Sequence, residues 1–328
     1  MAHIRILGTG GTIASRHEAG RGAIAGDTAA SLAGGLAGGH DTSTEEVLTL
    51  GSYQLGLGDL REICLGIARA QADPGVDGVV ITHGTDTVEE TAFLADLCHG
   101  GRVPVVFTGA QRTADSRSAD GPENLAQAIR FAATPALAGA GALIAFGGVV
   151  RSARGARKTH TLAPDPFSGG TRVAHIAGDA VRLDGFPART ARLGLPGPDF
   201  AERRVELVSS GAGIGPGLFG AAIDQGAEAV VLIGSGTGNA GPGFAEAVAE
   251  ATARDIPVIL GTRVPWGPVV PVYGNGGGTD LVAAGAIPAG ELAPHQARLL
   301  AAVLLSESAP TSTFRDRFLA QRDPAELG

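Results

Sequence analysis

The stretches IRILGTGGTIAS (residues 4–15) and GVVITHGTDT (residues 78–87) indicate the architecture of this chain. Each begins with an apolar run that predicts a buried strand and ends in a glycine-flanked turn, with Thr12 in the first turn and Thr85 in the second. In open α/β sheets, ligands bind beside the carboxyl ends of the strands. The two hydroxyls, with Asp86 next to the second, therefore suggest acyl transfer by a threonine nucleophile.

Short apolar runs alternate with helical patterns over residues 1–185. We expect strands at 4–7, 47–50, 78–82, 103–108 and 142–146, and helices at 59–71, 88–98 and 121–131. A hairpin at 173–183 is expected to close this region. The alternation predicts an α/β fold with a larger N-terminal catalytic domain, a mostly parallel sheet flanked by helices.

A smaller C-terminal α/β domain, residues 205–328, is expected after a linker at 186–204. The linker contains prolines and charges and has no sustained period. Strands are predicted at 205–208, 229–234 and 257–261, and helices at 217–225, 244–253, 294–306 and 312–320. A chain of 328 residues is long enough for two such domains.

The chain carries more acidic than basic residues, 33 against 25, for a net charge of −8. Phosphate binding needs a basic patch, so we expect no nucleic-acid partner and interpret the basic run at 151–158 as a solvated or locally paired loop. No apolar run approaches the roughly 20 residues that span a bilayer, and the first strand candidate leaves no room for a signal peptide. We therefore expect no membrane partner and a cytoplasmic location, with Cys64 and Cys98 packed as small apolar residues.

Residues 16–40 follow Thr12 directly and look too glycine-rich for a stable element. One interpretation is a lid that closes over a substrate, and the other is a disordered surface insert. The position after Thr12 favours the lid. Residues 274–279 form a second glycine-rich loop.

Six short motifs carry a resemblance to a known family. They are GTGGTIA (8–14), HGTDTVEET (83–91), TGAQR (108–112), SADGPENL (118–125), RKT (157–159) and GTGN (236–239). Through them nearly the whole chain resembles the bacterial-type L-asparaginases, amidohydrolases that convert asparagine to aspartate and ammonia. The resemblance implies a small-molecule substrate, L-asparagine or to a lesser extent L-glutamine, and neither a cofactor nor a metal.

The resemblance also implies two clusters of catalytic residues at one pocket. Thr12 would form the acyl-enzyme, and Thr85 with Asp86 and Lys158 would activate water for its hydrolysis. The reverse assignment of the two threonines remains open. Asp86 would bind the α-ammonium of the substrate, or cap the helix that follows, and the two roles can coexist.

Further residues would bind the substrate. The resemblance implies that Ser52 and the backbone around Gly84 bind the α-carboxylate, and that the carbonyl of Ala110 accepts from the leaving amide nitrogen. Gln111 and Asn124 have an alternative role as turn and helix-start residues.

The chain departs from the family pattern because it has no tyrosine between Thr12 and Tyr53. Tyr53 or Tyr273, the only tyrosines, could supply the missing phenol, or Thr12 could work without one. Tyr53 also replaces the residue expected after Ser52, which leaves Gln54 as a substitute for binding the α-ammonium. No acidic residue at 269–273 matches the one that some members contribute from the second domain.

Asn239 ends a second-domain strand, where asparagine beside glycine is ordinary turn chemistry. The resemblance implies that its loop reaches the active site of a neighbouring subunit, which predicts a homodimer or homotetramer with the C-terminal domain at the subunit interface. His83 suggests a metal or a general base, but no further ligand stands at metal-binding spacing, so we interpret it as a packed histidine.

Three other functions fit parts of the pattern. The first is the ammonia-releasing subunit of an amidotransferase, which normally carries an extra N-terminal domain, whereas the motif here begins at residue 8. The second is a non-catalytic amino-acid sensor that retains the pocket. The third, a dinucleotide-binding oxidoreductase, rests on residues 8–11 alone and lacks the full glycine fingerprint.

Overall fold

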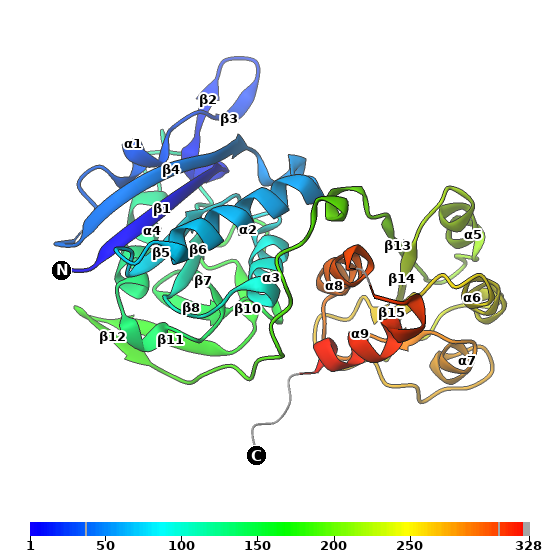
Figure 1. Cartoon of the computed structure of the whole chain (residues 1–328). Helices are drawn as coiled ribbons and strands as arrows, with labels where there is room; N and C mark the ends of the chain where they lie inside the picture. The colour runs from blue at the N-terminus through cyan, green and yellow to red at the C-terminus, as the bar shows by residue number, and fades with distance from the viewer. Residues whose placement is uncertain (37, 308, 324–328) are drawn as a thin grey trace. The chain divides into compact units, whose positions relative to one another are not determined.

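The computed structural model describes residues 1–36, 38–307 and 309–323. The chain forms two compact units (Figure 1). Unit 1 consists of Met1–Pro187 and Arg192–Leu195, and unit 2 of Ala188–Ala191 and the chain from Pro196 onward. Within the segment predicted as a linker, a 3-10 helix (η4, Pro198–Glu202) buries Phe200 in unit 2.

Unit 1 is built on an eight-stranded sheet in the order β12-β11-β8-β7-β6-β5-β1-β4. Five strands run parallel: β4 (Asp41–Leu50), β1 (His3–Gly10), β5 (Gly78–Thr82), β6 (Val105–Thr108) and β7 (Ala142–Phe146). Three antiparallel strands extend one edge: β8 (Val149–Ser152), β11 (Arg172–Ala177) and β12 (Ala180–Leu183). The central strands β5, β6 and β7 are buried along their whole length because helices cover both faces of the sheet there, whereas the edge strand β4 is polar and partly exposed.

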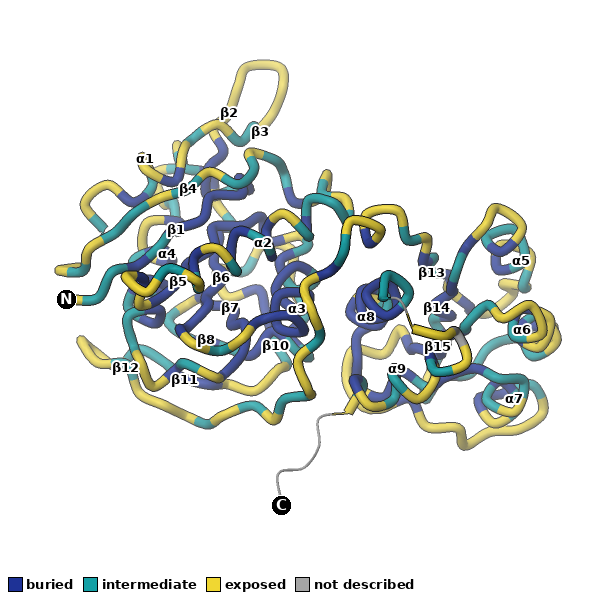
Figure 2. The backbone as a smooth tube through the Cα atoms, viewed as in Figure 1, coloured by how far each residue is buried: buried dark blue, intermediate teal, exposed yellow. Residues whose placement is uncertain are grey.

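Helices cover both faces of this sheet. On one face, α4 (Gly121–Ala132) and the short α1 (Ala29–Ala33) pack against Ile4 and Ile6 of β1 and Val80 of β5. On the other, α2 (Leu57–Ala72) and α3 (Val88–Cys98) lie side by side in front of the sheet in Figure 1. Figure 2 shows the central strands between these layers, β5, β6 and β7, as buried.

Unit 2 repeats the α/β pattern on a smaller scale. Its parallel strands, in sheet order, are β13 (Val205–Ser209), β14 (Ala229–Gly234), β15 (Val258–Thr262) and β16 (Ile287–Pro288). One face packs on α5 (Gly217–Asp224), α6 (Phe244–Ala253) and α7 (Gly278–Ala283). The other packs on α8 (Pro294–Ser306), which contacts α9 (Phe314–Arg322). The predicted fold class, a larger mostly parallel sheet with helices and a smaller α/β domain, is confirmed.

Two local predictions are wrong. Residues 16–40 were expected to form no stable element, but β2 (Ser15–Glu18) and β3 (Gly22–Ala25) form an antiparallel hairpin, and α1 follows. Glycines at positive φ, Gly20 at 74° and Gly22 at 80°, make its turn. The basic run at 151–158 was interpreted as a loop. It contains the end of β8 and β9 (Ala156–Lys158), which pairs with β10 (Phe167–Gly169).

Among the described residues, none of the helices combines the length and apolar character needed to cross a membrane. Short 3-10 turns complete the chain at Thr12–Ala14 (η1), Ser52–Gln54 (η2), Pro135–Leu137 (η3) and Thr311–Thr313 (η5). The first two of these turns begin directly after β1 and β4, and their first residues are polar.

Candidate active site

The candidate site forms where three parallel strands of unit 1 end. Strand β1 lies between β4 and β5, with Gly10 opposite Leu50 and Gly8 opposite Thr82. This register brings the turns after the three strands together, so that residues far apart in sequence become neighbours. Thr12, Ser52 and Thr85 are among the hydroxyl residues that these turns carry.

Glycine lets the turns approach one another closely. At Gly11, where φ is 79°, an added Cβ would lie 2.3 Å from the backbone nitrogen of Gly84. At Gly84, an added Cβ would lie 2.5 Å from the hydroxyl oxygen of Ser52. Any larger side chain would therefore push the three turns apart, which explains why glycine flanks both threonines.

A cavity of about 600 Å³ opens over these turns. Its walls include Thr12, Thr85 and Asp86 from the strand ends, and the β2–β3 hairpin supplies the opposite side with Arg21 and residues 23–25. The volume lies in the range usual for small-molecule sites. The predicted catalytic threonines thus share one cavity, and the segment predicted as a lid forms part of its wall.

Thr85, Asp86 and Lys158 form one connected group. The Lys158 ammonium donates a hydrogen bond to the Thr85 hydroxyl at 2.9 Å and forms an ion pair with an Asp86 carboxylate oxygen at 2.7 Å. Thr85 is 4% exposed, and the side chains of Lys158 and Asp86 are 16% and 57% exposed. The Thr12 hydroxyl is half-buried and makes no hydrogen bond to any residue within the described ranges.

Lys158 is the last residue of β9 and lies 72 residues after Asp86 in the sequence. The Glu89 carboxylate, in the first turn of α3, accepts a hydrogen bond from the Lys158 backbone nitrogen. Beside it, the Arg154 guanidinium lies 5.1 Å from the centre of the Phe93 ring, also on α3. Strand β9 is therefore fixed against the helix that begins just after Thr85 and Asp86.

Lys158 is also the only lysine among the 25 basic residues of the chain. Arginine serves at all other basic positions, although it and lysine are interchangeable at many exposed sites. A lysine differs chemically because its amine can give up a proton, whereas arginine stays charged in proteins. Lysine at this one position is therefore what proton transfer would require, whereas arginine could supply only charge.

The residues predicted to bind substrate fall into two sets. Ser52, Tyr53, Gln54 and Gly84 line the cavity with the threonines. Tyr53 is 73% exposed, with its ring against Gly51. The Gln54 side-chain oxygen, the atom that would face an ammonium group, already accepts a hydrogen bond from the Gly51 nitrogen at 3.2 Å.

Ala110 and Asn124 lie behind the cavity. Ala110 is fully buried at the end of β6, and the Asn124 amide donates to the neighbouring Gly109 carbonyl at 3.0 Å. The Gln111 backbone nitrogen donates to Asp120 at 3.0 Å, at the start of α4. Asn124 and Asp120 thus hold the turn after β6, which fits the structural alternative for Asn124.

Asn239 and Tyr273 belong to unit 2. The side-chain oxygen of Asn239 accepts a hydrogen bond from the Gly278 nitrogen at 2.9 Å, at the start of α7. Tyr273 is 60% exposed in the preceding loop. Unit 1 therefore brings together Thr12, Thr85, Asp86 and Lys158, the predicted catalytic residues, without these two, and the participation of Asn239 and Tyr273 stays a prediction.

His83 is completely buried between β5 and the Thr85 turn. Burial lowers its pKa from 6.5 to about 4, and one ring nitrogen, Nδ1, bonds to the Gly84 carbonyl at 2.8 Å. The imidazole is therefore neutral at pH 7. The packed-histidine interpretation is confirmed, and in the part of the chain that the structure describes His83 belongs to no group of three metal-ligating side chains.

The lid interpretation placed residues 16–40 at the site as a segment but did not single out Arg21 or residues 23–25, and the sequence did not point to Glu89. For the strands of the hairpin no signal existed, because its glycines predict irregular structure. Glu89 lies within the HGTDTVEET motif, and its contact with Lys158 spans 69 residues of sequence. For Lys158 itself, a signal independent of any family was present, since the chain has no other lysine.

Comparisons with known proteins agree with this geometry. Residues 3–187 match the family profile Asparaginase, N-terminal, and residues 204–318 match Glutaminase/Asparaginase C-terminal domain. A probable L-asparaginase of Deinococcus radiodurans is 39% identical, over 97% of each chain. A glutamyl-tRNA(Gln) amidotransferase component of Thermoplasma acidophilum is 34% identical over 96% of this chain and 78% of its own length. The crystal structure of a probable cytoplasmic L-asparaginase from Campylobacter jejuni, 29% identical, superposes with a TM-score of 0.86 over 98% of this chain and 100% of its own. The chain therefore belongs to the asparaginase family of hydrolases.

Proposed function

We propose that this enzyme is an L-asparaginase that hydrolyses L-asparagine to L-aspartate and ammonia through an acyl-threonine intermediate. The observation that carries the proposal is the contact of the sole lysine, Lys158, with Thr85 and Asp86 at the edge of the cavity that holds Thr12. The names of the relatives from Deinococcus and Campylobacter support the same substrate.

The two half-reactions use the two threonines in turn. Thr12 attacks the side-chain amide carbon, and the carbon–nitrogen bond breaks as ammonia leaves with the proton from the Thr12 hydroxyl. In the second half-reaction Lys158, as the neutral amine, accepts the Thr85 hydroxyl proton while Thr85 takes a proton from water. The water oxygen attacks the acyl ester, and the bond to Thr12 breaks as the relay returns the proton to the Thr12 oxygen, which releases aspartate. Asp86 binds the α-ammonium, while Ser52 and the backbone at Gly84 bind the α-carboxylate.

Substitutions at Lys158 test whether it transfers a proton or only supplies charge. Lys158→Met and Thr85→Val are each expected to lower kcat by about 10² to 10⁴, the usual range for loss of acid–base function, as measured by ammonia release. The double variant is expected to be little slower than either single one, because parts of one relay are not additive. Lys158→Arg keeps the charge but cannot give up a proton, so it is expected to be as slow as Lys158→Met.

Two outcomes would contradict this mechanism. Multiplicative losses in the double variant would mean that Thr85 and Lys158 act independently. An active Lys158→Arg enzyme would mean that only charge is needed. The acyl-enzyme itself is tested by mass spectrometry after rapid acid quenching, with a gain of one aspartyl group expected on Thr12 and none in Thr12→Val.

Glutamine is the second candidate substrate, because a cavity of about 600 Å³ leaves room for one more methylene group. The amidotransferase relative supports a third function, ammonia supply to a charged transfer RNA, but this chain matches only 78% of that relative's length. Measuring ammonia release from asparagine and from glutamine separates these functions. Release from either amino acid indicates a hydrolase, and release from neither indicates a non-catalytic sensor.

We also propose a cytoplasmic enzyme that works as a homodimer or homotetramer, with residues 1–185 as the catalytic domain and 205–328 at the subunit interface. The name of the Campylobacter relative supports the location. Complementation tests the assembly. Mixing an inactive Thr12→Val chain with an inactive Asn239→Ala chain is expected to restore activity if Asn239 serves a neighbour's site, and no recovery would argue against shared sites.

A further inference from the structure

A second cavity, of about 470 Å³, lies in unit 1 and shares no residue with the Thr12–Thr85 cavity. It is enclosed by the C-terminal halves of α2 and α3 and by the strap Arg192–Leu195. Its volume is within the range of small-molecule sites. Nothing in the proposed reaction uses this cavity.

The floor of this second cavity is apolar. Ile67 and Cys64 of α2 and Ala95 and Cys98 of α3 are buried there. Burial raises the pKa of both thiols, that of Cys98 to about 12, so neither is a thiolate at neutral pH. The floor therefore offers an uncharged surface between two helices, suited to an apolar chain of a ligand.

Arg192 brings a positive charge to the mouth of the cavity. It is exposed, and its guanidinium packs against Gly100, where an added Cβ would lie 2.9 Å from Nη1. No hydrogen bond or ion pair joins Arg192 to another residue in the described part of the chain. A guanidinium without a carboxylate partner, beside an apolar floor, is complementary to an anion with an apolar tail.

The second arginine at the cavity, Arg102, is already occupied. Its guanidinium donates to the carbonyls of Gln71, Asp73 and Val76 at 2.8, 2.8 and 3.2 Å, where it caps the end of α2. Arg102 therefore has a structural role in the cavity wall, whereas the Arg192 guanidinium remains available to bind a ligand.

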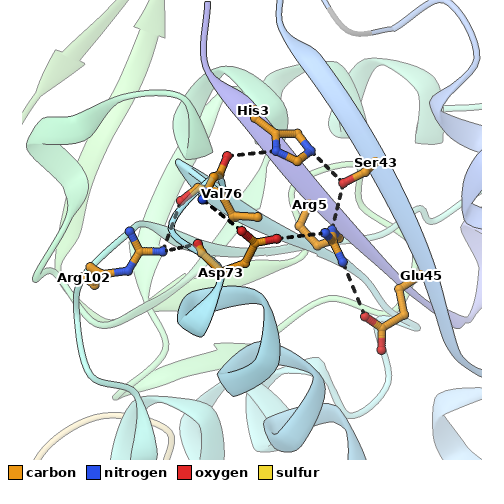
Figure 3. Close-up of polar contacts among 8 residues, drawn as sticks. His3, Arg5, Ser43, Glu45, Asp73, Val76 and Arg102 are labelled. Carbon is orange, nitrogen blue, oxygen red and sulfur yellow. Dashed lines mark hydrogen bonds and ion pairs between the residues drawn. The ribbon is translucent and has the colours of Figure 1, made fainter.

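The walls of the cavity are held in place by polar contacts. Figure 3 shows Arg102 at the end of α2, and beyond it Asp73 in contact with Arg5, which also bonds to Ser43 at 2.8 Å. On the opposite wall, the backbone nitrogen of Leu193 donates to the Leu97 carbonyl at 2.8 Å and ties the strap to α3. These contacts preform the cavity, which lowers the cost of ordering it around a ligand.

We propose that this cavity binds a small monocarboxylate with an unbranched apolar tail, its carboxylate on Arg192 and its tail between α2 and α3. The ligand would enter a site separate from the catalytic threonines. The inference does not depend on the proposed function, because binding is measured without any reaction.

Isothermal titration of the full-length protein with octanoate tests the proposal, with 1-octanol as the uncharged probe of the same length. Octanoate is expected to bind at least tenfold more tightly than octanol. Arg192→Gln is expected to weaken octanoate at least tenfold and to leave octanol unchanged. Arg182→Gln is the matched control, because Arg182 is also exposed, on edge strand β12, with no acceptor among the described residues.

Filling the cavity provides an independent test. Ala68, on the cavity side of α2, is half-buried, and Ala68→Trp is expected to abolish binding of both probes while the far-UV circular dichroism spectrum of the protein is retained. The proposal fails if octanoate does not bind to the wild-type protein. It also fails if Ala68→Trp binds octanoate normally, or if Arg192→Gln and Arg182→Gln have the same affinity.

Discussion

His83 is expected to make the stability of unit 1 depend on pH in a defined window. Its pKa falls from 6.5 to about 4 on folding because burial desolvates the charged imidazole. Between these values the unfolded chain binds a proton that the folded chain does not, so the free energy of unfolding decreases as the pH falls. Each pH unit is worth about 1.4 kcal/mol, and from pH 6.5 to pH 5 the loss is about 2 kcal/mol. The contribution of His83 becomes constant only above about pH 7.5, where the unfolded imidazole is also neutral.

Urea denaturation between pH 5 and pH 7.5 measures this loss, and His83→Gln isolates it. The window lies above the range in which carboxylates titrate, about 4, so protonation of Asp and Glu contributes little. Glutamine keeps a polar side chain but has no proton to gain, so the variant is expected to have lower stability and a flatter pH profile. His160→Gln, which removes an exposed imidazole, is the matched control and is expected to retain the wild-type profile.

An unchanged pH dependence in His83→Gln would refute this reasoning. It would mean that the folded chain binds a proton at His83 as easily as the unfolded one does. In that case the neutral imidazole beside Gly84 would not be a fixed feature of the site, and His83 would have to be reconsidered as a proton carrier near Thr85.

Three further predictions concern the cavity at Thr12. Tyr53→Phe is expected mainly to raise KM, because Tyr53 lines the cavity. Tyr273→Phe is expected to lower kcat if the loop that carries Tyr273 serves a neighbouring subunit. The opposite pattern would make Tyr53 the phenol that assists Thr12. Amide hydrogen exchange in the β2–β3 hairpin is expected to slow when aspartate is added, and unchanged exchange at saturation would make the hairpin a static wall. Gly11→Ala is expected to reduce thermal stability more than Gly22→Ala. The two glycines have nearly the same φ angle, 79° and 80°, but only Gly11 has backbone within 4 Å of the added Cβ. Equal losses would mean that the turns move apart freely.

The sequence predicts best where burial is complete. Strands 78–82 and 142–146 and helix 88–98 were predicted with the bounds that the structure has, because unbroken apolar runs admit few alternatives inside a covered sheet. The β2–β3 hairpin was missed because exposed strands rich in glycine carry no hydrophobic period. Strand β9 was missed because two of its three residues, Arg157 and Lys158, are charged, although their long apolar stems leave them half-buried.

The candidate site was likewise predictable from the sequence only in part. Thr12, Ser52 and Thr85 follow predicted strands, and parallel neighbours must end at the same edge of a sheet, so their proximity could be expected from sequence. The contact between Lys158 and Thr85 spans 73 residues. It depends on the antiparallel pair β9–β10, which no local sequence pattern predicts. Only the resemblance to a family, or the rarity of lysine in this chain, pointed to it.

The two threonines differ in how far this chain prepares them for catalysis. Thr85 has a nitrogen partner in Lys158 at 2.9 Å, held by Glu89 and the start of α3, so the contacts of the proposed relay are present without a substrate. The Thr12 hydroxyl has no such partner among the described residues, although it faces the same cavity. In the proposed mechanism, activation of Thr12 would therefore need a group that enters the cavity, either a side chain of the hairpin or of another chain, or the substrate and its water. This asymmetry favours a mechanism in which Thr85 and Lys158 work without rearrangement, while attack by Thr12 waits for the cavity to close.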